Sequence, residues 1–191
     1  MPPKPKITAD DILNAALSLI REYGYDSLNA RRIAHVLNCS TKPLFRVYDN
    51  MESLKKDIQG KALEFYYSFL RSNMNKENDI FLSIGKNYIQ FAHEEKELFK
   101  YIFLSNNMPF KSLEELINFA DMSDLIQHLM LSAGISEKAA KNLFLSLWLL
   151  VHGIATMFAT NPCTLDNEEI ELLLINAFKA QYKHLKSEEI L

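Results

Sequence analysis

Apolar residues recur at helical spacing through nearly the whole chain, and this pattern restricts the protein to helical folds. The sequence lacks runs in which Val, Ile or Thr alternate with polar residues, as they do in half-buried strands. Of the 191 residues, 48% are hydrophobic and 24% are charged, which is enough to build the core of a globular protein. We therefore predict an all-α fold of about nine helices.

Start and stop signals divide the first part of the chain into short helices. Thr8, with acidic Asp11 three residues later, predicts the start of a first helix, and Gly24 predicts its end. Asn29 is the predicted N-cap of a short second helix. Asn38 then tolerates the positive φ that a tight turn requires.

A third helix is predicted to begin at Ser40, with Leu44 and Tyr48 facing the core. Asp49 and Asn50 would cap a long fourth helix. Two short helices joined by a tight turn, the second with a polar and basic face, are typical of a helix-turn-helix.

The remaining helices are predicted from the same signals, after a polar turn at residues 72–79. Their expected ranges are 78–94, 96–105, 111–133, 136–160 and 167–186. We predict a helix-turn-helix domain over residues 1–50 and a second helical domain over residues 51–191.

The chemistry of the first domain favours DNA. Lys42 and Arg46 could read guanine, whereas the Thr41 methyl or the Pro43 ring could pack on a thymine methyl. Phe45, if it projects outward, would contact sugar or a base methyl. The candidate DNA-binding residues are Asn29, Arg31, Arg32, Ser40, Thr41, Lys42, Pro43, Phe45, Arg46, Tyr48 and Lys55. The alternative is that this helical pair is an ordinary part of a bundle.

Charge is distributed unevenly along the sequence. Residues 1–60 carry nine Lys and Arg against seven Asp and Glu, which leaves twelve against seventeen for the rest of the chain. This asymmetry suits a DNA-facing first domain and a second domain that stays away from DNA.

Residues 12–58 resemble the DNA-binding region of the tetracycline-repressor (TetR) family. The positions in register are Ile12-Leu13, Ala15-Ala16, Gly24-Tyr25, Ile33-Ala34, Ser40, Leu44, Asn50, Glu52 and Leu54. The resemblance implies a one-component transcriptional regulator, a repressor by expectation. The resemblance also implies that the regulator is a homodimer that binds a palindromic DNA operator. A small-molecule effector, whose identity the sequence does not give, would release it from the DNA.

Two departures from the family pattern leave a second interpretation open. Phe45 stands where the family has a Tyr that binds phosphate, and Met51 replaces a Lys that touches phosphate. The alternative is therefore a helical ligand-binding or interaction module with weak or lost DNA binding.

The second half resembles the part of this family that binds an effector and dimerises. The stretch "WLLVHGIA" at 148–155 resembles a Trp-x-x-x-His-Gly signature of one subset. The candidate ligand-binding residues are Phe91, Phe99, Phe103, Met108, Phe119, Leu147, Trp148, Val151, His152 and Met157. The alternative is that each is an ordinary core residue, which is the more frequent role of such residues at helical spacing. His152 could equally bind a ligand or be satisfied by a neighbouring helix.

The helix at 139–160 is apolar on several faces, and the last predicted helix carries one apolar stripe that includes Ile170, Leu174 and Leu185. Helices this apolar need a second surface to cover. The family packs them across a two-fold axis. The candidate dimer residues are Ile154, Phe158, Ile170, Leu174, Ala177 and Phe178. The alternative is that these residues form the internal core of a monomer.

Other functional classes find little support. The five histidines form no metal-binding pair, and no phosphate-binding glycine loop or nucleophile motif occurs, so we predict no enzyme activity, metal or cofactor. The N-terminal "MPPKPK" lacks the apolar run of a signal peptide, and the apolar stretch 143–159 is short for a membrane span. With only two cysteines, Cys39 and Cys163, we expect a cytoplasmic protein without a membrane partner.

Overall fold

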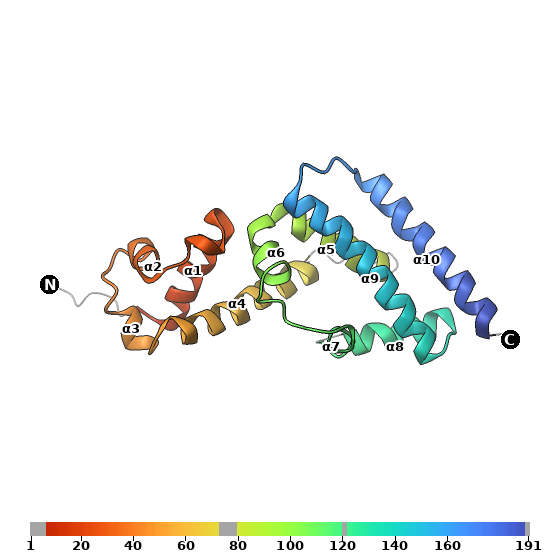
Figure 1. Cartoon of the computed structure of the whole chain (residues 1–191), viewed down its shortest axis with the longest axis horizontal. Helices are drawn as coiled ribbons and strands as arrows, with labels where there is room; N and C mark the ends of the chain where they lie inside the picture. The colour runs from red at the N-terminus through yellow and green to blue at the C-terminus, as the bar shows by residue number, and fades with distance from the viewer. Residues whose placement is uncertain (1–6, 73–79, 120–121, 190–191) are drawn as a thin grey trace. The chain divides into compact units, whose positions relative to one another are not determined.

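The protein is all-α, as predicted. The computed structural model describes residues 7–72, 80–119 and 122–189, and within these ranges it contains ten α-helices, one 3-10 turn and no strand (Figure 1). In chain order the helices are α1 (Ala9–Tyr23), η1 (Tyr25–Ser27), α2 (Ala30–Val36), α3 (Leu44–Val47), α4 (Met51–Ser72), α5 (Ile80–Glu94), α6 (Lys96–Phe103), α7 (Leu113–Ile117), α8 (Met122–Ala133), α9 (Glu137–Thr160) and α10 (Asn167–Glu189).

The chain forms two compact units. The first contains Met1–Arg71 and Glu95–Met108, and the second contains Ser72–Glu94 and Pro109–Leu191. The predicted division after residue 50 does not follow these units. Helix α4 stays with the first unit because its Lys61 pairs with Asp10 of α1 and its Tyr66 packs on Phe103 of α6. The N-terminal "MPPKPK" and most of the predicted turn at 72–79 lie outside the described residues.

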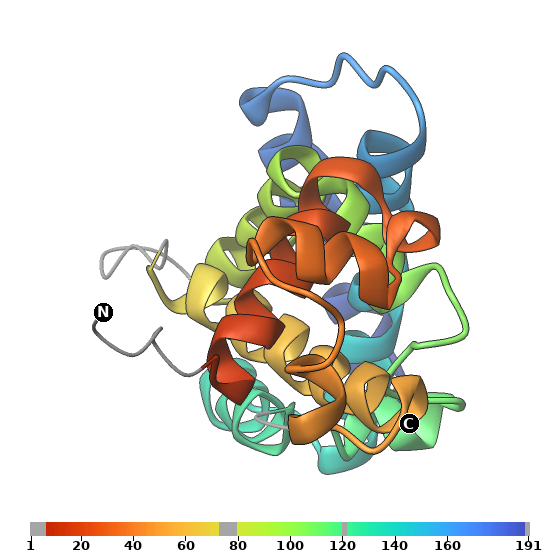
Figure 2. The ribbon, with the colours of Figure 1, turned by 90° about the vertical axis from the view of Figure 1, so that its left-hand side faces the viewer.

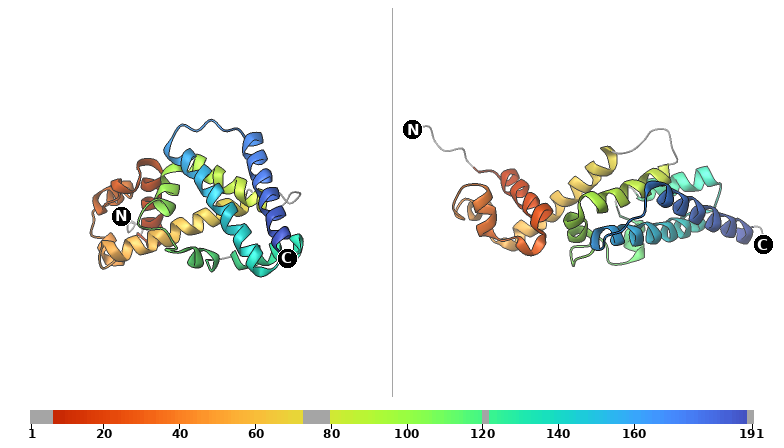
Figure 3. Two further views of the ribbon diagram at one scale, coloured as in Figure 1. Left: turned by 45° about the vertical axis from the view of Figure 1, so that its right-hand side comes forward. Right: turned by 90° about the horizontal axis from the view of Figure 1, so that it is seen from above.

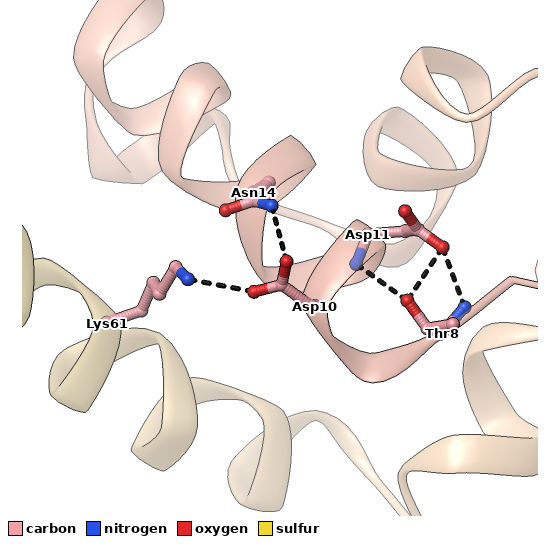
Figure 4. A network of polar contacts seen from close by, with 5 residues as sticks. All are labelled: Thr8, Asp10, Asp11, Asn14 and Lys61. Atoms are coloured by element: carbon pink, nitrogen blue, oxygen red, sulfur yellow. Dashed lines mark hydrogen bonds and ion pairs between the residues drawn. The ribbon is translucent and has the colours of Figure 1, made fainter.

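Helix α1 begins and ends where the sequence predicts. The Thr8 hydroxyl accepts a hydrogen bond from the Asp11 amide at 3.2 Å, and the Asp11 carboxylate accepts one from the Thr8 amide at 2.8 Å (Figure 4). Gly24 ends the helix at φ 77°, and its amide bonds to the Ile20 carbonyl. The apolar face between these caps is buried. Both ends of this helix are fixed by residues close to them in the sequence.

Helix α6 packs on α1 within the first unit. The Arg21 guanidinium donates two hydrogen bonds to the Glu95 carboxylate, one of them at 2.7 Å, and lies 4.5 Å from the centre of the Phe65 ring. The rings of Tyr25 and Tyr101 stack with centres 4.9 Å apart. Charged and aromatic side chains therefore hold α6 and its N-cap Glu95 against α1 and the residues that follow it.

The second unit is built around α5, α9 and α10, with α8 against α9 (Figure 3). Gly85 of α5 allows a close approach, because a Cβ atom there would lie 3.3 Å from methyl groups of both Leu174 and Val151. Lys86 of α5 pairs with Glu171 of α10 at 2.7 Å. These contacts join helices that are far apart in the sequence.

One predicted helix in this unit was wrong. The range 111–133 forms two helices, because α7 ends at Ile117 and α8 begins at Met122. The Phe119 amide bonds to the Leu116 carbonyl, three residues back, and this tight turn takes the chain out of the α-helical hydrogen-bond pattern.

Helix α9 is the only helix among the described residues that is long and apolar enough to cross a membrane. Core helices of globular proteins share that length and composition. Its buried residues, from Ala139 to Ala159, pack inside the second unit.

Candidate functional site

Helices α2 and α3 and the turn between them form the predicted helix-turn-helix (Figure 2). The Asn29 side chain caps α2 by accepting a hydrogen bond from the Arg32 amide at 3.0 Å, as predicted. Ile33 and Ala34 are buried, and α2 packs on α1. Asn38 has a φ of 49°, which confirms the predicted left-handed turn.

Helix α3 is shorter than the sequence predicts. It begins at Leu44, whereas we had placed its start at Ser40, and in this described segment no side chain caps it. The residue before a proline is disfavoured in the helical conformation, so Pro43 opposes a helix that continues through Lys42. Residues 41–43 instead form a turn, in which the Phe45 amide bonds to the Thr41 carbonyl at 3.3 Å.

Leu44 and Tyr48 anchor α3 in the core. Both side chains are buried, as the helical spacing predicts. Burial raises the pKa of Tyr48, and the neighbouring Asp57 carboxylate raises it further. Tyr48 is therefore a supporting residue beneath the surface, although it was one of the DNA-binding candidates.

The outward face of this region is cationic. Arg31, Arg32, Lys42 and Arg46 are all exposed, and no Asp or Glu occurs between Asn29 and Tyr48. Thr41 and Pro43 are half-buried, and Ser40 is exposed. A segment with four exposed cations and no Asp or Glu of its own attracts a polyanion.

Aromatic rings lie beside two of the candidate cations. The Arg32 guanidinium lies 4.9 Å from the centre of the exposed Tyr23 ring. The Lys55 ammonium pairs with Glu52 at 3.2 Å and lies 6.0 Å from the Tyr25 ring. The Glu52 carboxylate raises the pKa of Lys55. Sequence reasoning did not find Tyr23, because the tertiary packing of α1 on α2 brings it to Arg32.

The predicted ligand-binding residues are divided between the two units. Phe99, Phe103 and Met108 belong to the first unit, and the others belong to the second. Phe99 and Phe103 pack on each other with ring centres 5.2 Å apart, inside the first unit's core. Met157 is exposed on α9.

Several of the second-unit candidates form an aromatic row. Phe110 contacts both Phe119 and Trp148, at ring-centre distances of 5.9 and 5.4 Å. Trp148 stacks on His152, whose Nδ1 lies 2.9 Å from the Tyr88 hydroxyl. Burial lowers the pKa of His152. Tyr88 and Phe110 were not predicted, since only the packing of α5 and the loop before α7 brings them to α9.

A surface hollow of about 560 Å³ opens next to this row. It is lined by Pro109, Ser112, Glu114, Glu115, Asn118 and Phe119. Of the predicted ligand-binding residues, only Phe119 lines it. Phe91, Leu147 and Val151 are instead buried in the packed interior of the second unit.

The predicted dimer residues are mostly internal. Ile154, Phe158, Ile170 and Leu174 are buried within a single copy of the chain, whereas Ala177 and Phe178 are half-buried. The helical faces had been assigned from periodicity, which cannot distinguish a core face from an interface. The exposed apolar residues of α9 and α10 are Leu149, Met157, Leu172 and Leu173.

Among solved structures, the chain is similar to a TetR-family protein from Vibrio parahaemolyticus that is named as a transcriptional regulator. The TM-score is 0.60 and the sequence identity is 18%, over 90% of this chain and 97% of that one. No protein-family model and no curated protein matches the chain. At this identity the likeness shows a shared all-α fold over nearly the full length of both chains.

Proposed function

We propose that the chain is a transcriptional regulator that binds double-stranded DNA through α2, α3 and the turn between them. One observation carries this proposal: the surface from Asn29 to Tyr48 exposes Arg31, Arg32, Lys42 and Arg46 and contains no carboxylate. In a helix-turn-helix the first helix crosses the phosphate backbone and the second enters the major groove. Arg31 and Arg32 would then neutralise phosphates, and Lys42 and Arg46 would reach base edges. The similarity of the fold to a TetR-family protein supports the assignment.

The proposed regulator acts as a homodimer, because two recognition helices are needed for the two halves of a palindromic operator. Leu149, Gly153 and Met157 lie four residues apart on the exposed side of α9. A Cβ atom on Gly153 would have no neighbour within 4 Å among the residues that the structure describes, so none of them requires a glycine there. A glycine within a helix costs about 1 kcal/mol relative to alanine, and close approach of another helix would explain its presence.

Leu149, Gly153 and Met157 form a stripe along α9 that can pair with the same stripe of a second copy. Leu149 and Met157 lie at equal distances on either side of Gly153, so an antiparallel pairing about a two-fold axis would bring Leu149 against the partner's Met157. Ser146 and Thr160, seven residues away on either side, would pair in the same way. Leu172 and Leu173 of α10 are also exposed and would add apolar surface to the proposed dimer face.

A small-molecule effector would bind the second unit and release the DNA. The aromatic row with its one polar pair, Tyr88 and His152, suits an apolar molecule with a single hydrogen-bonding group. Release requires the effector to prefer a conformation whose recognition helices are wrongly spaced. The change would pass from the second unit to the first at two places where the chain joins them, which are the end of α4 and Glu95 between α5 and α6. We place this repressor, which needs no cofactor and catalyses no reaction, in the cytoplasm.

DNA binding can be tested by fluorescence anisotropy with a random-sequence duplex and with DNA from upstream of the chain's own gene. We expect tighter binding to the upstream DNA, and weaker binding for Lys42→Ala and Arg46→Ala. Lys138→Ala, which removes an exposed lysine at the start of α9, is the matched control and should bind like the wild type. No binding of either duplex would overturn the proposal.

Dimerisation can be tested by measuring the molar mass in solution with light scattering. Leu149→Gln should shift the wild-type dimer toward monomer. Leu131→Gln, which alters an exposed leucine of α8, should leave the dimer intact. A wild-type monomer, or equal effects of the two variants, would contradict the proposed dimer face.

A second candidate function is a helical ligand-binding module without useful DNA affinity. The exposed phenyl ring of Phe45 favours it, because the ring offers no hydrogen bond to a phosphate. The same anisotropy measurement separates the two candidates, since this module would bind neither duplex.

A further inference from the structure

The exposed side chains of α3 are unusually apolar for a surface surrounded by cations. Leu44 is buried, so α3 presents Phe45, Arg46 and Val47 to its surroundings. Phe45 is 47% exposed and Val47 is 40% exposed. Nothing inside the chain covers them fully, although their burial would be favourable.

These side chains limit what α3 can recognise in a major groove. Phe and Val have no donor or acceptor, so they cannot read guanine O6 or N7 or adenine N6. Residues 44–47 include no Asn or Gln, the side chains that bind adenine with two hydrogen bonds. The one apolar group that a base pair presents in the major groove is the C5 methyl of thymine.

The charge around Phe45 and Val47 favours DNA over a protein as the partner of this surface. Arg46 lies between them, and no Asp or Glu occurs from Asn29 to Tyr48, so the segment carries charge of one sign only, which attracts a polyanion. Lys42, Arg31 and Arg32 are exposed on the preceding turn and helix. The same surface therefore combines cations for phosphates with apolar side chains for a methyl group.

We propose that Phe45 and Val47 read thymine methyl groups, so that the chain selects duplexes in part by thymines in the major groove. This proposal rests on the proposed function, because it presupposes that α3 meets DNA. Lys42 and Arg46 supply the remaining polar contacts, and the buried Leu44 and Tyr48 hold the two apolar side chains outward.

Deoxyuridine provides a selective probe, because it removes the C5 methyl and keeps the phosphates and the pairing edge. A duplex is first selected from a random-sequence library with the full-length protein. It is then synthesised in two forms, one with thymidine and one with deoxyuridine at every such position. We expect the deoxyuridine form to bind more weakly, by about fourfold for each methyl group that is contacted.

Variants connect this difference to α3. Phe45→Ser and Val47→Ser should bind the thymidine form more weakly and should reduce the difference between the two forms. Val36→Ser is the matched control, since Val36 is 44% exposed on α2, and it should keep the wild-type difference. Circular dichroism of each variant checks that the helical fold is retained.

The outcomes separate the two proposals. If no library duplex is bound, the proposed function fails and the methyl readout fails with it. If a selected duplex is bound equally in both forms, the methyl readout is overturned and DNA binding stands. In that case, unchanged DNA affinity of the Phe45 and Val47 variants would exclude these side chains from the DNA contacts.

Discussion

The indole ring of Trp148 lies parallel to the imidazole ring of His152, with ring centres 4.7 Å apart and planes inclined by 11°. The Tyr88 hydroxyl lies 2.9 Å from Nδ1 of the same histidine and donates to it when that nitrogen is unprotonated. Trp148 is the only tryptophan in the sequence. Its fluorescence therefore reports directly on the surroundings of His152.

Stability should depend on pH through His152. Burial lowers the folded-state pKa of His152 below its ordinary value of 6.5, so the unfolded chain takes up a proton at a higher pH than the folded chain. The free energy of unfolding should thus fall as the pH drops below 6.5, until the folded pKa is reached. Urea unfolding followed by Trp148 emission measures this loss.

A matched pair of variants tests that assignment. His152→Gln should remove the pH dependence, whereas His35→Gln, which changes an exposed histidine of α2, should keep it. Equal dependence in both variants would show that another group is responsible.

Gly85 should be sensitive to substitution and Gly60 should not. A Cβ atom on Gly85 would meet buried Leu174 and Val151 at 3.3 Å, whereas one on Gly60 would meet nothing within 4 Å. We expect Gly85→Ala to lower the free energy of unfolding by about 1 kcal/mol, because overpacking outweighs the gain in helix propensity. Gly60→Ala should raise it by about 0.5–1 kcal/mol. Thermal unfolding by circular dichroism measures both, and a stabilised Gly85→Ala would show that Leu174 and Val151 give way.

The pair of Arg21 and Glu95 should contribute to the stability of the first unit. Arg21 binds the carboxylate with two donors and also lies over Phe65, and a lysine reproduces neither geometry. Since the Arg21 side chain is 40% exposed, we expect Arg21→Lys to cost only about 1 kcal/mol. A double-mutant cycle with Arg21→Ala and Glu95→Ala measures the coupling.

The pair of Lys141 and Glu137 on α9 provides a comparison, because it joins exposed residues within one helix. Its double-mutant cycle should give a smaller coupling. Couplings of equal size would mean that the two-donor geometry of Arg21 on Glu95 adds nothing to the pair.

The salt dependence of DNA binding should identify the phosphate contacts. A protein that neutralises phosphates loses affinity linearly in a plot of log affinity against log salt, with a slope of about −0.9 for each phosphate on B-DNA. Arg31→Ala and Arg32→Ala should each make the slope shallower by about 0.9 per half-site. Anisotropy titrations at several salt concentrations measure the slope, and an unchanged slope would remove the residue from the phosphate contacts.

Local signals in the sequence determined where most of the helices begin and end. Thr8, Gly24, Asn29 and Asn38 act through their own backbone neighbours, so a cap or a left-handed turn can be read without knowing the fold. The exception within the helix-turn-helix is α3, where Pro43 outweighed the start signal at Ser40.

The cationic face was also predictable, because it depends on one continuous segment without acidic residues. Spacing placed Leu44 inward and therefore Phe45 and Arg46 outward. The partner of Arg32 was not predictable, because Tyr23 reaches it from a different helix.

The sequence by itself determined the helical class, the caps and the charge of the α2–α3 surface, because these depend on residues within a few positions of one another. Only the tertiary structure decided which apolar faces are covered. Ile154 and Ile170 are core residues, whereas Leu149 and Leu172 are exposed, although all four lie in apolar helices. Periodicity records that a face is apolar, and burial depends on contacts among α5, α9 and α10 across long stretches of sequence.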